Sequence, residues 1–331
     1  MKIFLTGATG FVGQNLLARL LNEGHSVNIL VRDVPEASIY HHSRVKIFQG
    51  DLLDRKVIFE AVHACDEVYH VAGYARVWAK DPATYFRVNV EGTVNVFDAA
   101  LHHKVRRVVF TSTGGTYGAS NGRPICEEMV RLTDFFNEYE SSKFMAERKA
   151  LEYVLKGLDV VIVQPLRIYG PGVMSESNPI SHIMKSYISG EWHIVPGTGR
   201  AISSFVYIDD VVEGHLRAMR HGRTGERYIL GGVNTNFRHF FSVLEEISGK
   251  KYFLFRLPMV AIMAFAWKEE LAARWFKISP LITPKWLRKY NLDMACSSEK
   301  AVRELGYRIT PLEDGVRKTL KWLQKEYHLY F

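Results

Sequence analysis

Short runs of apolar, β-branched residues recur along the first two-thirds of the chain, and each is followed by turn-forming residues. These runs predict six buried strands, at Lys2–Thr6, Val27–Val31, Val45–Gln49, Glu67–Val71, Arg107–Thr111 and Val160–Gln164. Between them, apolar residues at helical spacing predict helices over Val12–Glu23, Lys56–Ala64, Pro82–His103 and Tyr139–Lys156. Continuous apolar strands that alternate with helices are typical of a parallel sheet covered on both faces. The pattern therefore predicts an α/β fold built on a doubly wound parallel sheet.

After Pro171 the alternation becomes less regular. It predicts helices at Ile180–Ser189, Val211–His221, Phe237–Ser248 and Leu312–His328, short strands at Ser204–Ile208 and Arg227–Leu230, and an aromatic-rich apolar stretch from Tyr252 to Phe276. No low-complexity linker separates the two parts. We therefore expect one domain over residues 1–171, to which later segments return, and a smaller C-terminal α/β lobe over residues 172–331.

Composition and charge exclude several classes of protein. The 331 residues include 43 Lys and Arg against 35 Asp and Glu, spread thinly along the chain. This excess fits a solvated basic surface or attraction to an anionic cofactor, substrate or lipid surface, and no motif indicates nucleic acid binding. The longest uncharged apolar run, Pro258–Trp267, is about half of a membrane span. The chain enters its first strand without a signal sequence, and its 3 cysteines form no framework, which predicts a cytoplasmic protein.

A glycine-rich turn follows the first strand. The segment TGATGFVG at residues 6–13 places Gly7, Gly10 and Gly13 between a strand and a helix. Such glycines permit a tight turn, a close approach of backbone to a pyrophosphate, and close packing of helix on strand, while helix-terminal amides face the phosphates. Because the strand-turn-helix context is complete, residues 1–171 are predicted to be a Rossmann NAD(P)-binding domain and residues 172–331 mostly a substrate-binding lobe.

The end of the second strand bears on the choice of dinucleotide. An NAD-specific protein usually carries an acid there to bind the adenosine ribose. Here that position is Val31, and Arg32 follows, whose guanidinium suits a 2′-phosphate. We therefore expect NADP(H) to be favoured over NAD(H), although Asp33 argues for the ribose contact.

A tyrosine and a lysine are spaced four apart in the segment YESSK at residues 139–143. On a helix this spacing brings Tyr139 and Lys143 onto one face, where the ammonium favours the phenolate form of the tyrosine. Such a pair exchanges a proton with a substrate hydroxyl or carbonyl. Upstream, the hydroxyl-rich turn TSTGGTYG at residues 111–118 follows a strand, at the edge where α/β proteins bind ligands. The 13 histidines show no chelating spacing, and no metal site is expected.

These motifs, in this order, resemble the extended branch of the short-chain dehydrogenase/reductase superfamily, over nearly the whole chain. Further matches are Gly50-Asp51-Leu52, Tyr69-His70-Val71-Ala72-Gly73, Asn89-Val90-Glu91-Gly92-Thr93, Ile168-Tyr169-Gly170-Pro171-Gly172 and Phe205-Val206-Tyr207-Ile208-Asp209-Asp210-Val211. Within that branch the sequence is most similar to dihydroflavonol-4-reductase-like proteins and hopanoid-associated sugar epimerases. The 3β-hydroxysteroid dehydrogenase/isomerases share the general layout.

The resemblance implies roles for individual residues. Tyr139 would be the general acid/base, Lys143 would lower its pKa and hold the nicotinamide ribose, and Thr113 would bind the substrate oxygen, with Ser112 as the alternative. Most relatives carry Ser where this chain has Thr113, whose side chain is stiffer. The expected cofactor-binding residues, besides Arg32, Tyr139 and Lys143, are Gly7, Thr9, Gly10, Phe11, Val12, Gly13, Asp51, Leu52, Ala72, Gly73, Pro165 and Ile168.

Substrate contacts are less specified. Tyr74, Arg76 and Trp78 lie in the loop after the fourth strand, where aromatic rings would stack on a ring-bearing substrate or, alternatively, pack the loop onto the next helix. Tyr169 is a further expected substrate contact. Nucleotide-sugar relatives carry a basic residue just before the FVYIDD-like motif, but here serines precede it and Arg200 sits earlier, which argues against a nucleotide sugar.

The apolar stretch from Tyr252 to Phe276 has two interpretations. In the first, it is a lid over a lipophilic substrate or a patch that touches a membrane surface. In the second, it forms the core of the lobe or a homodimer face. A homodimer through helices Pro82–His103 and Tyr139–Lys156 would match the interface common among the relatives.

The sequence thus predicts an NADP(H)-preferring oxidoreductase that reduces a ketone or aldehyde of a small apolar or ring-containing molecule. Two alternatives remain open: an NAD-dependent sugar epimerase or dehydratase that retains its cofactor, and a dinucleotide-sensing binding protein without turnover. Retention of both Tyr139 and Lys143 argues against the second.

Overall fold

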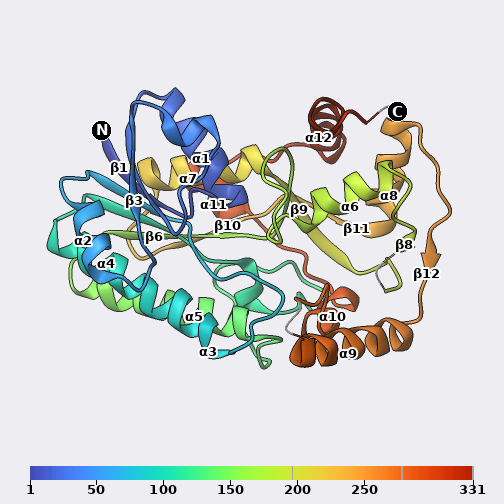
Figure 1. Ribbon diagram of the computed structural model, residues 1–331. Coiled ribbons are helices and arrows are strands. Elements are labelled where there is room, and N and C mark those ends of the chain that lie inside the picture. Colours follow the sequence, from blue (N-terminus) through green and yellow to red (C-terminus); the bar gives the residue numbers. More distant parts are fainter. Residues whose placement is uncertain (196, 277–278, 330–331) are drawn as a thin grey trace.

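A seven-stranded parallel sheet forms the centre of the computed structural model, which describes residues 1–195, 197–276 and 279–329 (Figure 1). Its strand order is β10-β6-β5-β4-β1-β2-β3. The strands are β1 (Lys2–Thr6), β2 (Ser26–Val31), β3 (Val45–Gln49), β4 (Glu67–His70), β5 (Arg107–Thr111), β6 (Val160–Pro165) and β10 (Arg227–Leu230). All six pairings between neighbours are parallel. The doubly wound sheet predicted from the sequence is confirmed.

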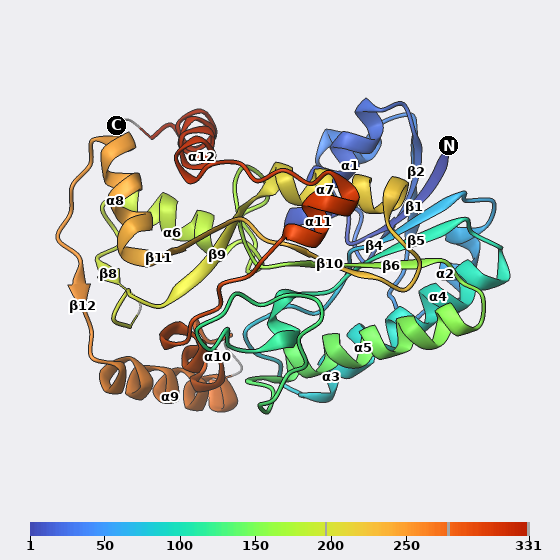
Figure 2. The same ribbon diagram turned by 180° about the vertical axis from the view of Figure 1, so that it is seen from behind.

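Helices cover both faces of this sheet (Figures 1 and 2). One layer contains α1 (Phe11–Asn22), α7 (Ile208–His221) and α11 (Glu299–Leu305), and the other contains α2 (Arg55–Val62), α4 (Gly92–His102) and α5 (Glu138–Leu155). Successive strand residues serve opposite cores because side chains alternate across a sheet. In β1, Ile3 and Leu5 join the core under α1, whereas Phe4 joins the core under α4.

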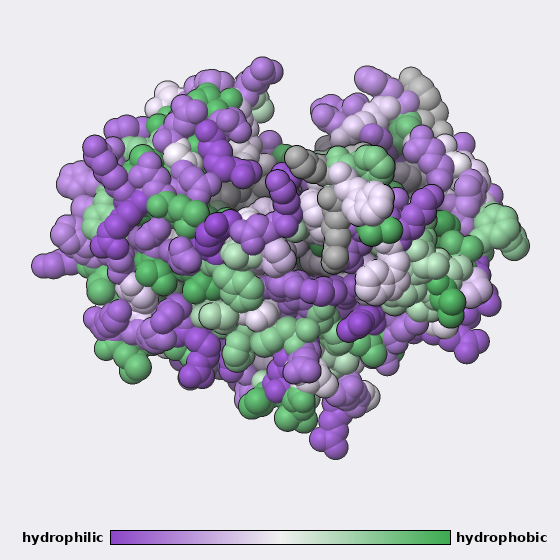
Figure 3. Space-filling model, turned by 60° about the horizontal axis from the view of Figure 1, so that its bottom comes forward, coloured by the Kyte–Doolittle hydropathy of each residue, from purple (hydrophilic) through white to green (hydrophobic). Residues whose placement is uncertain are grey.

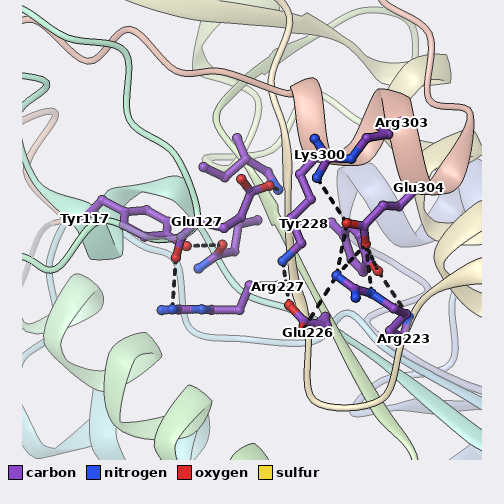
Figure 4. A network of polar contacts seen from close by, with 11 residues as sticks. Tyr117, Glu127, Arg223, Glu226, Arg227, Tyr228, Lys300, Arg303 and Glu304 are labelled. Carbon is purple, nitrogen blue, oxygen red and sulfur yellow. Dashed lines mark hydrogen bonds and ion pairs between the residues drawn. The ribbon is translucent and has the colours of Figure 1, made fainter.

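Segments after residue 171 return to the sheet, because β10 is its outer strand and α7 and α11 pack over it. A polar network holds this edge (Figure 4). The buried carboxylate of Glu127 accepts a hydrogen bond from the backbone N–H of Ile229 at 2.7 Å, and Arg227 donates to the carbonyl of Glu127 at 3.0 Å. Nearby, Lys300 of α11 pairs with Glu226 at 2.5 Å. Side chains therefore cover the outer strand, and the backbone N–H of Ile229 on its free edge has a partner.

The smaller lobe is built on a three-stranded sheet of order β11-β9-β7. Its elements are β7 (Arg167–Tyr169), α6 (Pro179–Ile188), β9 (Ile202–Tyr207), β11 (Val233–Asn236), α8 (Phe237–Ser248) and α12 (Leu312–Tyr327). Figure 2 shows α6, α8 and α12 together on the side of the molecule away from α2 and α4. Phe205, Phe237 and Phe240 pack ring against ring between β9 and α8. These rings belong to the hydrophobic core that also lies under α1, so the lobe and the central sheet share one core.

The rest of the chain consists of short elements and one long peripheral helix. The short elements are η1 (Ser38–His41), α3 (Ala83–Phe86), η2 (Arg87–Glu91), η3 (Gly114–Tyr117), β8 (Ile194–Val195), β12 (Phe255–Arg256), α10 (Pro284–Leu287) and η4 (Arg288–Asn291). The long helix is α9 (Met259–Phe276), which runs along the bottom of Figure 1 and packs against α10. Many of its large apolar side chains are exposed, so the interpretation of this stretch as lobe core is wrong. Within the described ranges, no helix is long and apolar enough to cross a bilayer.

Candidate active site

The glycine turn leaves no room for side chains where the sequence places glycine. Gly7 has a φ of +76°, and a Cβ there would lie 2.7 Å from the backbone N of Ala72. A Cβ at Gly13 would overlap the carbonyl of Gly7. Helix α1 begins directly after Gly10, which supplies no side-chain cap, so its first amides remain available to an anion. The turn fits the pyrophosphate of a dinucleotide.

Two further segments at this edge of the sheet surround the glycine turn. Arg32 and Asp33, just after β2, are both exposed, and the hydroxyl of Tyr40 ties the following turn to the carbonyl of Ala8 at 3.2 Å. After β3, the Asp51 carboxylate accepts from the backbone N–H of Leu53 at 3.0 Å, while Leu52 is buried. The structure therefore brings these expected cofactor-binding positions to the edge that carries the glycine turn.

Lys143 lies under the ends of β4 and β5. Its ammonium donates to the carbonyl of Thr111 at 2.6 Å and sits 4.4 Å from the centre of the Phe110 ring. A Cβ at Gly73 would stand 3.7 Å from Lys143 Nζ, so the glycine keeps the space in front of the ammonium open. Burial lowers the pKa of Lys143 to about 7 because the charged form loses hydration. The lysine is therefore poised to change charge near neutral pH.

Tyr139 stands one helical turn before Lys143 on α5. Burial raises its pKa to about 12, although a hydrogen bond with Thr113 favours the phenolate and opposes this rise. Thr113 also accepts from the backbone N–H of Gly115 at 3.2 Å, which fixes its hydroxyl at the start of η3. The ring of Tyr139 stacks on Trp286, with centroids 5.9 Å apart and planes at 23°. The phenol, the threonine hydroxyl and the lysine thus form one group at the carboxyl end of β5.

Ser112, the alternative to Thr113, takes part in a different network. It is buried and donates to the Glu147 carboxylate, which also accepts from Gln164 Nε2 at 2.9 Å. Gln164 in turn accepts from the Tyr117 hydroxyl at 2.8 Å. Burial raises the pKa of Glu147. The hydroxyl of Ser112 is directed into this buried network, and Thr113 is the one that meets Tyr139.

The loop after β4 packs against α3, the helix that follows it. The Tyr74 hydroxyl donates to the carbonyl of Trp78 at 3.1 Å, and the Tyr74 ring meets Tyr85 of α3 edge-on at 4.9 Å. Tyr85 donates to the carbonyl of Arg76 at 2.7 Å, and the Arg76 guanidinium approaches Glu176 at 3.8 Å. Of the two interpretations of this loop, these contacts match packing onto the next helix.

Three expected contacts lie farther along the chain. Pro165 ends β6 and is buried, and Ile168 of β7 pairs with Val206 in the smaller sheet. Tyr169 is 1% exposed, and its ring packs on Tyr207. The structure therefore places Tyr169 in the hydrophobic core, and its role as a substrate contact stays a prediction.

Asn89 belongs to the site although sequence reasoning assigned it no role. It lies in the π-helical turn η2, donates to Ser142 Oγ at 2.9 Å, and accepts from the Tyr74 N–H at 2.6 Å. Ser142 in turn donates to the carbonyl of Tyr139 at 2.9 Å. Asn89 thus joins α5 to the loop after β4. The Asn-Val-Glu-Gly-Thr motif was the available signal.

A buried charge cluster behind Tyr139 had no sequence signal. Glu140 is fully buried and pairs with Arg131 at 3.0 Å and with Lys289 at 2.5 Å. Lys289 comes from η4, directly after the helix that carries Trp286. These residues lie far apart in sequence, so only folding reveals that α10 and η4 cover the start of α5.

Two buried histidines anchor the strand ends beneath the site. His70 Nδ1 lies 2.7 Å from Thr6 Oγ1 and Nε2 lies 2.9 Å from Thr93 Oγ1. On the other face, His215 Nε2 lies 2.8 Å from Thr111 Oγ1. Burial lowers the pKa of His70 to about 3 and that of His215 to about 4, so both rings are neutral. Their hydrogen bonds serve the framework of the sheet.

Comparison with known proteins agrees with this geometry. A sequence model of the NAD dependent epimerase/dehydratase family matches residues 3–231. The chain belongs to this family. The NAD(P)-dependent members act on CH–OH groups, so the protein is an NAD(P)-binding enzyme of the extended short-chain dehydrogenase/reductase type, as the resemblance implied.

Individual relatives are similar over nearly their whole length. The chain is 29% identical to a putative dihydroflavonol 4-reductase of Synechocystis sp., covering 97% of this chain and 94% of that protein. It is 31% identical to the 4-hydroxy-2-methyl-3-oxo-4-farnesyl-3,4-dihydroquinoline-1-oxide ketoreductase of Stigmatella aurantiaca, covering 93% and 92%. The structure of a Bacillus cereus UDP-glucuronic acid 4-epimerase with NAD has a TM-score of 0.79 at 24% identity over 99% of this chain and 98% of that one, which shows a shared fold.

Proposed function

We propose that the protein is an NADP(H)-preferring oxidoreductase that reduces a ketone or aldehyde of a small apolar or ring-containing molecule, or oxidises the corresponding alcohol. The observation that carries this proposal is the grouping of Tyr139, Thr113 and Lys143 beside the glycine turn, with the ring of Trp286 stacked on Tyr139. The names of two relatives, a dihydroflavonol reductase and a ketoreductase of a farnesylated quinoline oxide, support a ring-bearing ketone as substrate.

The bound dinucleotide supplies the hydride chemistry, and the chain supplies the proton and its control. Thr113 holds the substrate oxygen through its hydroxyl, and Tyr139 donates the proton to that oxygen. A phenol with a pKa raised by burial is a poor acid, so the positive charge of Lys143 is needed to stabilise the phenolate that remains. Asn89 and Ser142 keep the start of α5, and with it Tyr139, in position.

The residues around this group favour an apolar substrate. Trp286 presents an aromatic ring beside Tyr139. Aromatic side chains pack well against flat apolar rings. Ser203 and Ser204, just before the FVYIDD-like motif, are buried and uncharged. We therefore expect no nucleotide sugar.

Substitution of the phenol tests the catalytic assignment. Tyr139→Phe removes the proton donor and leaves the ring, so turnover is expected to fall by about 100-fold or more with nucleotide binding unchanged. Tyr153→Phe on the same helix is the matched control, since its hydroxyl meets Asp98 away from the site. Thr113→Val should also lower turnover strongly. Turnover of Tyr139→Phe near that of the wild type would refute the assignment.

Fluorescence titration with NADPH and, separately, NADH tests the cofactor preference. If Arg32 binds the 2′-phosphate, the wild type should prefer NADPH by about tenfold or more, because a charge-assisted hydrogen bond contributes about 1.5–3 kcal/mol. Arg32→Gln should remove most of that preference and leave NADH affinity unchanged. A wild type that prefers NADH would mean that Asp33 decides the specificity.

The family name supports a second candidate, a sugar epimerase or dehydratase that returns the hydride to the same molecule. Such an enzyme retains its dinucleotide through the catalytic cycle. Purified protein that carries bound nucleotide through extensive dialysis, and that oxidises no exogenous NADPH with ketone substrates, would favour this second candidate over the reductase.

A further inference from the structure

Helix α9 presents its large apolar side chains to solvent. Val260, Trp267, Leu271 and Trp275 are 81%, 58%, 55% and 74% exposed. They are spaced seven, four and four residues apart, which places them on one stripe of the helix. On the protein-facing side, Ala266 and Ala273 are buried and Ile262 is half-buried, whereas Phe265 and Phe276, 45% and 70% exposed, lie off the stripe. A surface helix of a soluble domain normally has the opposite arrangement, with its large apolar residues inward.

The exposed apolar surface continues from α9 into the segment that precedes it. Phe253 and Phe255 are 73% and 55% exposed and lie around β12, at the outer edge of the lobe. An open apolar groove along α9 is lined by Met259, Val260 and Trp267, among others. In Figure 3, which brings the bottom of the molecule forward, apolar side chains gather on this side. Soluble monomers rarely expose a contiguous apolar surface of this extent without a partner.

Positive charge borders this surface directly. Arg200, Arg238 and Arg256 line a cavity of about 320 Å³ that shares Met259 with the groove on α9. Partial burial, with the charges of Arg256 and Arg200, lowers the pKa of Arg238. Among the described residues, no carboxylate lies within 4.0 Å of any of the three guanidinium groups. The exposed Lys268 adds a further positive charge beside the stripe.

Acidic residues of the helix lie away from the stripe. Glu269 and Glu270 are partly buried on the side of α9 that faces the protein, where Glu269 accepts from the Leu281 N–H at 3.4 Å. The outward face of α9 therefore combines aromatic and aliphatic side chains with a basic border. Exposed apolar side chains beside cationic groups suit the interfacial region of an anionic membrane, where the apolar groups enter among acyl chains and the cations meet headgroups.

We propose that the face formed by β12, α9 and the three arginines docks on an anionic lipid bilayer. The apolar stripe enters the interfacial region, and Arg200, Arg238 and Arg256 contact lipid phosphates. This surface adjoins the active site, because α9 packs against α10, whose Trp286 covers Tyr139. Docking would bring the site close to molecules dissolved in the membrane.

Vesicle co-sedimentation of the full chain tests the proposal. Vesicles of phosphatidylcholine alone are compared with vesicles that contain about 30% phosphatidylglycerol. We expect clear binding to the anionic vesicles, weaker binding to the neutral ones, and loss of binding as salt is added. The double variant Trp267→Glu/Trp275→Glu should bind the anionic vesicles at least about tenfold more weakly. Arg256→Gln should weaken binding to anionic vesicles only.

A charge-matched control isolates the surface from the change in net charge. Val302→Glu/Ile309→Glu adds the same two negative charges at positions that are 47% and 40% exposed, beyond α9. This variant should bind as the wild type does, and thermal unfolding confirms that both double variants are folded. Absence of wild-type binding to either vesicle, or equal binding by Trp267→Glu/Trp275→Glu, would overturn the proposal.

A measurement of the oligomeric state tests the alternative that a second copy of the chain covers this face. If size-exclusion chromatography shows a dimer that Trp267→Glu/Trp275→Glu dissociates, and no vesicle is bound, the stripe joins two copies of the chain and membrane docking is refuted. Vesicle binding is measured without turnover, so its failure leaves the oxidoreductase assignment untouched.

Discussion

Replacement of Lys143 by methionine should stabilise the cofactor-free protein in a pH-dependent manner. The ammonium is buried, and burial lowers its pKa from 10.5 to about 7. That difference corresponds to about 5 kcal/mol for a fully protonated lysine, at about 1.4 kcal/mol for each tenfold change in proton affinity. Methionine fills a similar volume without a charge. The role proposed for the ammonium beside Tyr139 gives a functional reason for keeping a group that costs stability.

The direction of the pH dependence follows from proton counting. Between about pH 7 and 10.5 the unfolded chain holds the lysine proton and the folded chain releases it. The free energy of unfolding of the wild type therefore increases as pH rises through this range. Lys143→Met lacks that gain. The free-energy difference between wild type and variant should therefore shift by about 2–3 kcal/mol in favour of the wild type between about pH 6.5 and pH 9.

Urea unfolding followed by fluorescence of the 6 tryptophans measures this difference at each pH. Comparison at matched pH cancels the groups that titrate in both proteins. The variant also loses the hydrogen bond from Lys143 to the carbonyl of Thr111, a cost of about 1–2 kcal/mol that does not change the slope. If the difference in free energy of unfolding between wild type and variant is the same at both pH values, the pKa of the buried ammonium is not lowered and the prediction is refuted.

Two further pairs of substitutions test the packing of the site. Gly13→Ala should lower the melting temperature and abolish NADPH binding, because the added methyl overlaps the backbone of the glycine turn. Gly10→Ala, whose added methyl would lie 3.3 Å from its nearest neighbour, should also abolish binding but with a smaller loss of stability. Equal melting temperatures of the two variants would contradict this. Lys289→Met should lower the free energy of unfolding in urea by about 1–3 kcal/mol, because Glu140 stays buried with one cation fewer. Lys285→Met removes one partner of an exposed ion pair and should lower it by less than about 0.5 kcal/mol. Similar losses in the two variants would contradict the difference in burial.

The central sheet could be predicted from local sequence patterns. Strands β1, β3 and β5 have the bounds that their apolar runs predict. In β1 and β5 every residue after the first is buried, which accounts for the continuous apolar runs, whereas β3 at the edge of the sheet is only partly buried. The helix predicted over Pro82–His103 is present as α3, η2 and α4, but its π-helical turn at Asn89 was not foreseen. That turn satisfies a contact with Ser142 on another helix, and a single-sequence pattern holds no information on such a contact.

The choice between neighbouring hydroxyls needed the folded chain. Ser112 and Thr113 are adjacent and chemically similar, and both lie just after β5, where each meets a different residue of α5. Ser112 meets Glu147 in the buried network, and Thr113 meets Tyr139. The sequence pattern identified the pair of hydroxyls, whereas their directions depended on the backbone of β5 and η3.

By itself the sequence determined the parallel sheet, the glycine turn and the pairing of Tyr139 with Lys143, because each depends on residues within a few positions of one another. Tertiary structure alone decided that Trp286 covers Tyr139, that Lys289 and Arg131 neutralise Glu140, and that α9 turns its aromatic side outward. An apolar run looks the same in sequence whether it faces a core or solvent. The direction depends on how the folded helix docks, which buries Ala266 and Ala273 and leaves Trp267 and Trp275 in solvent.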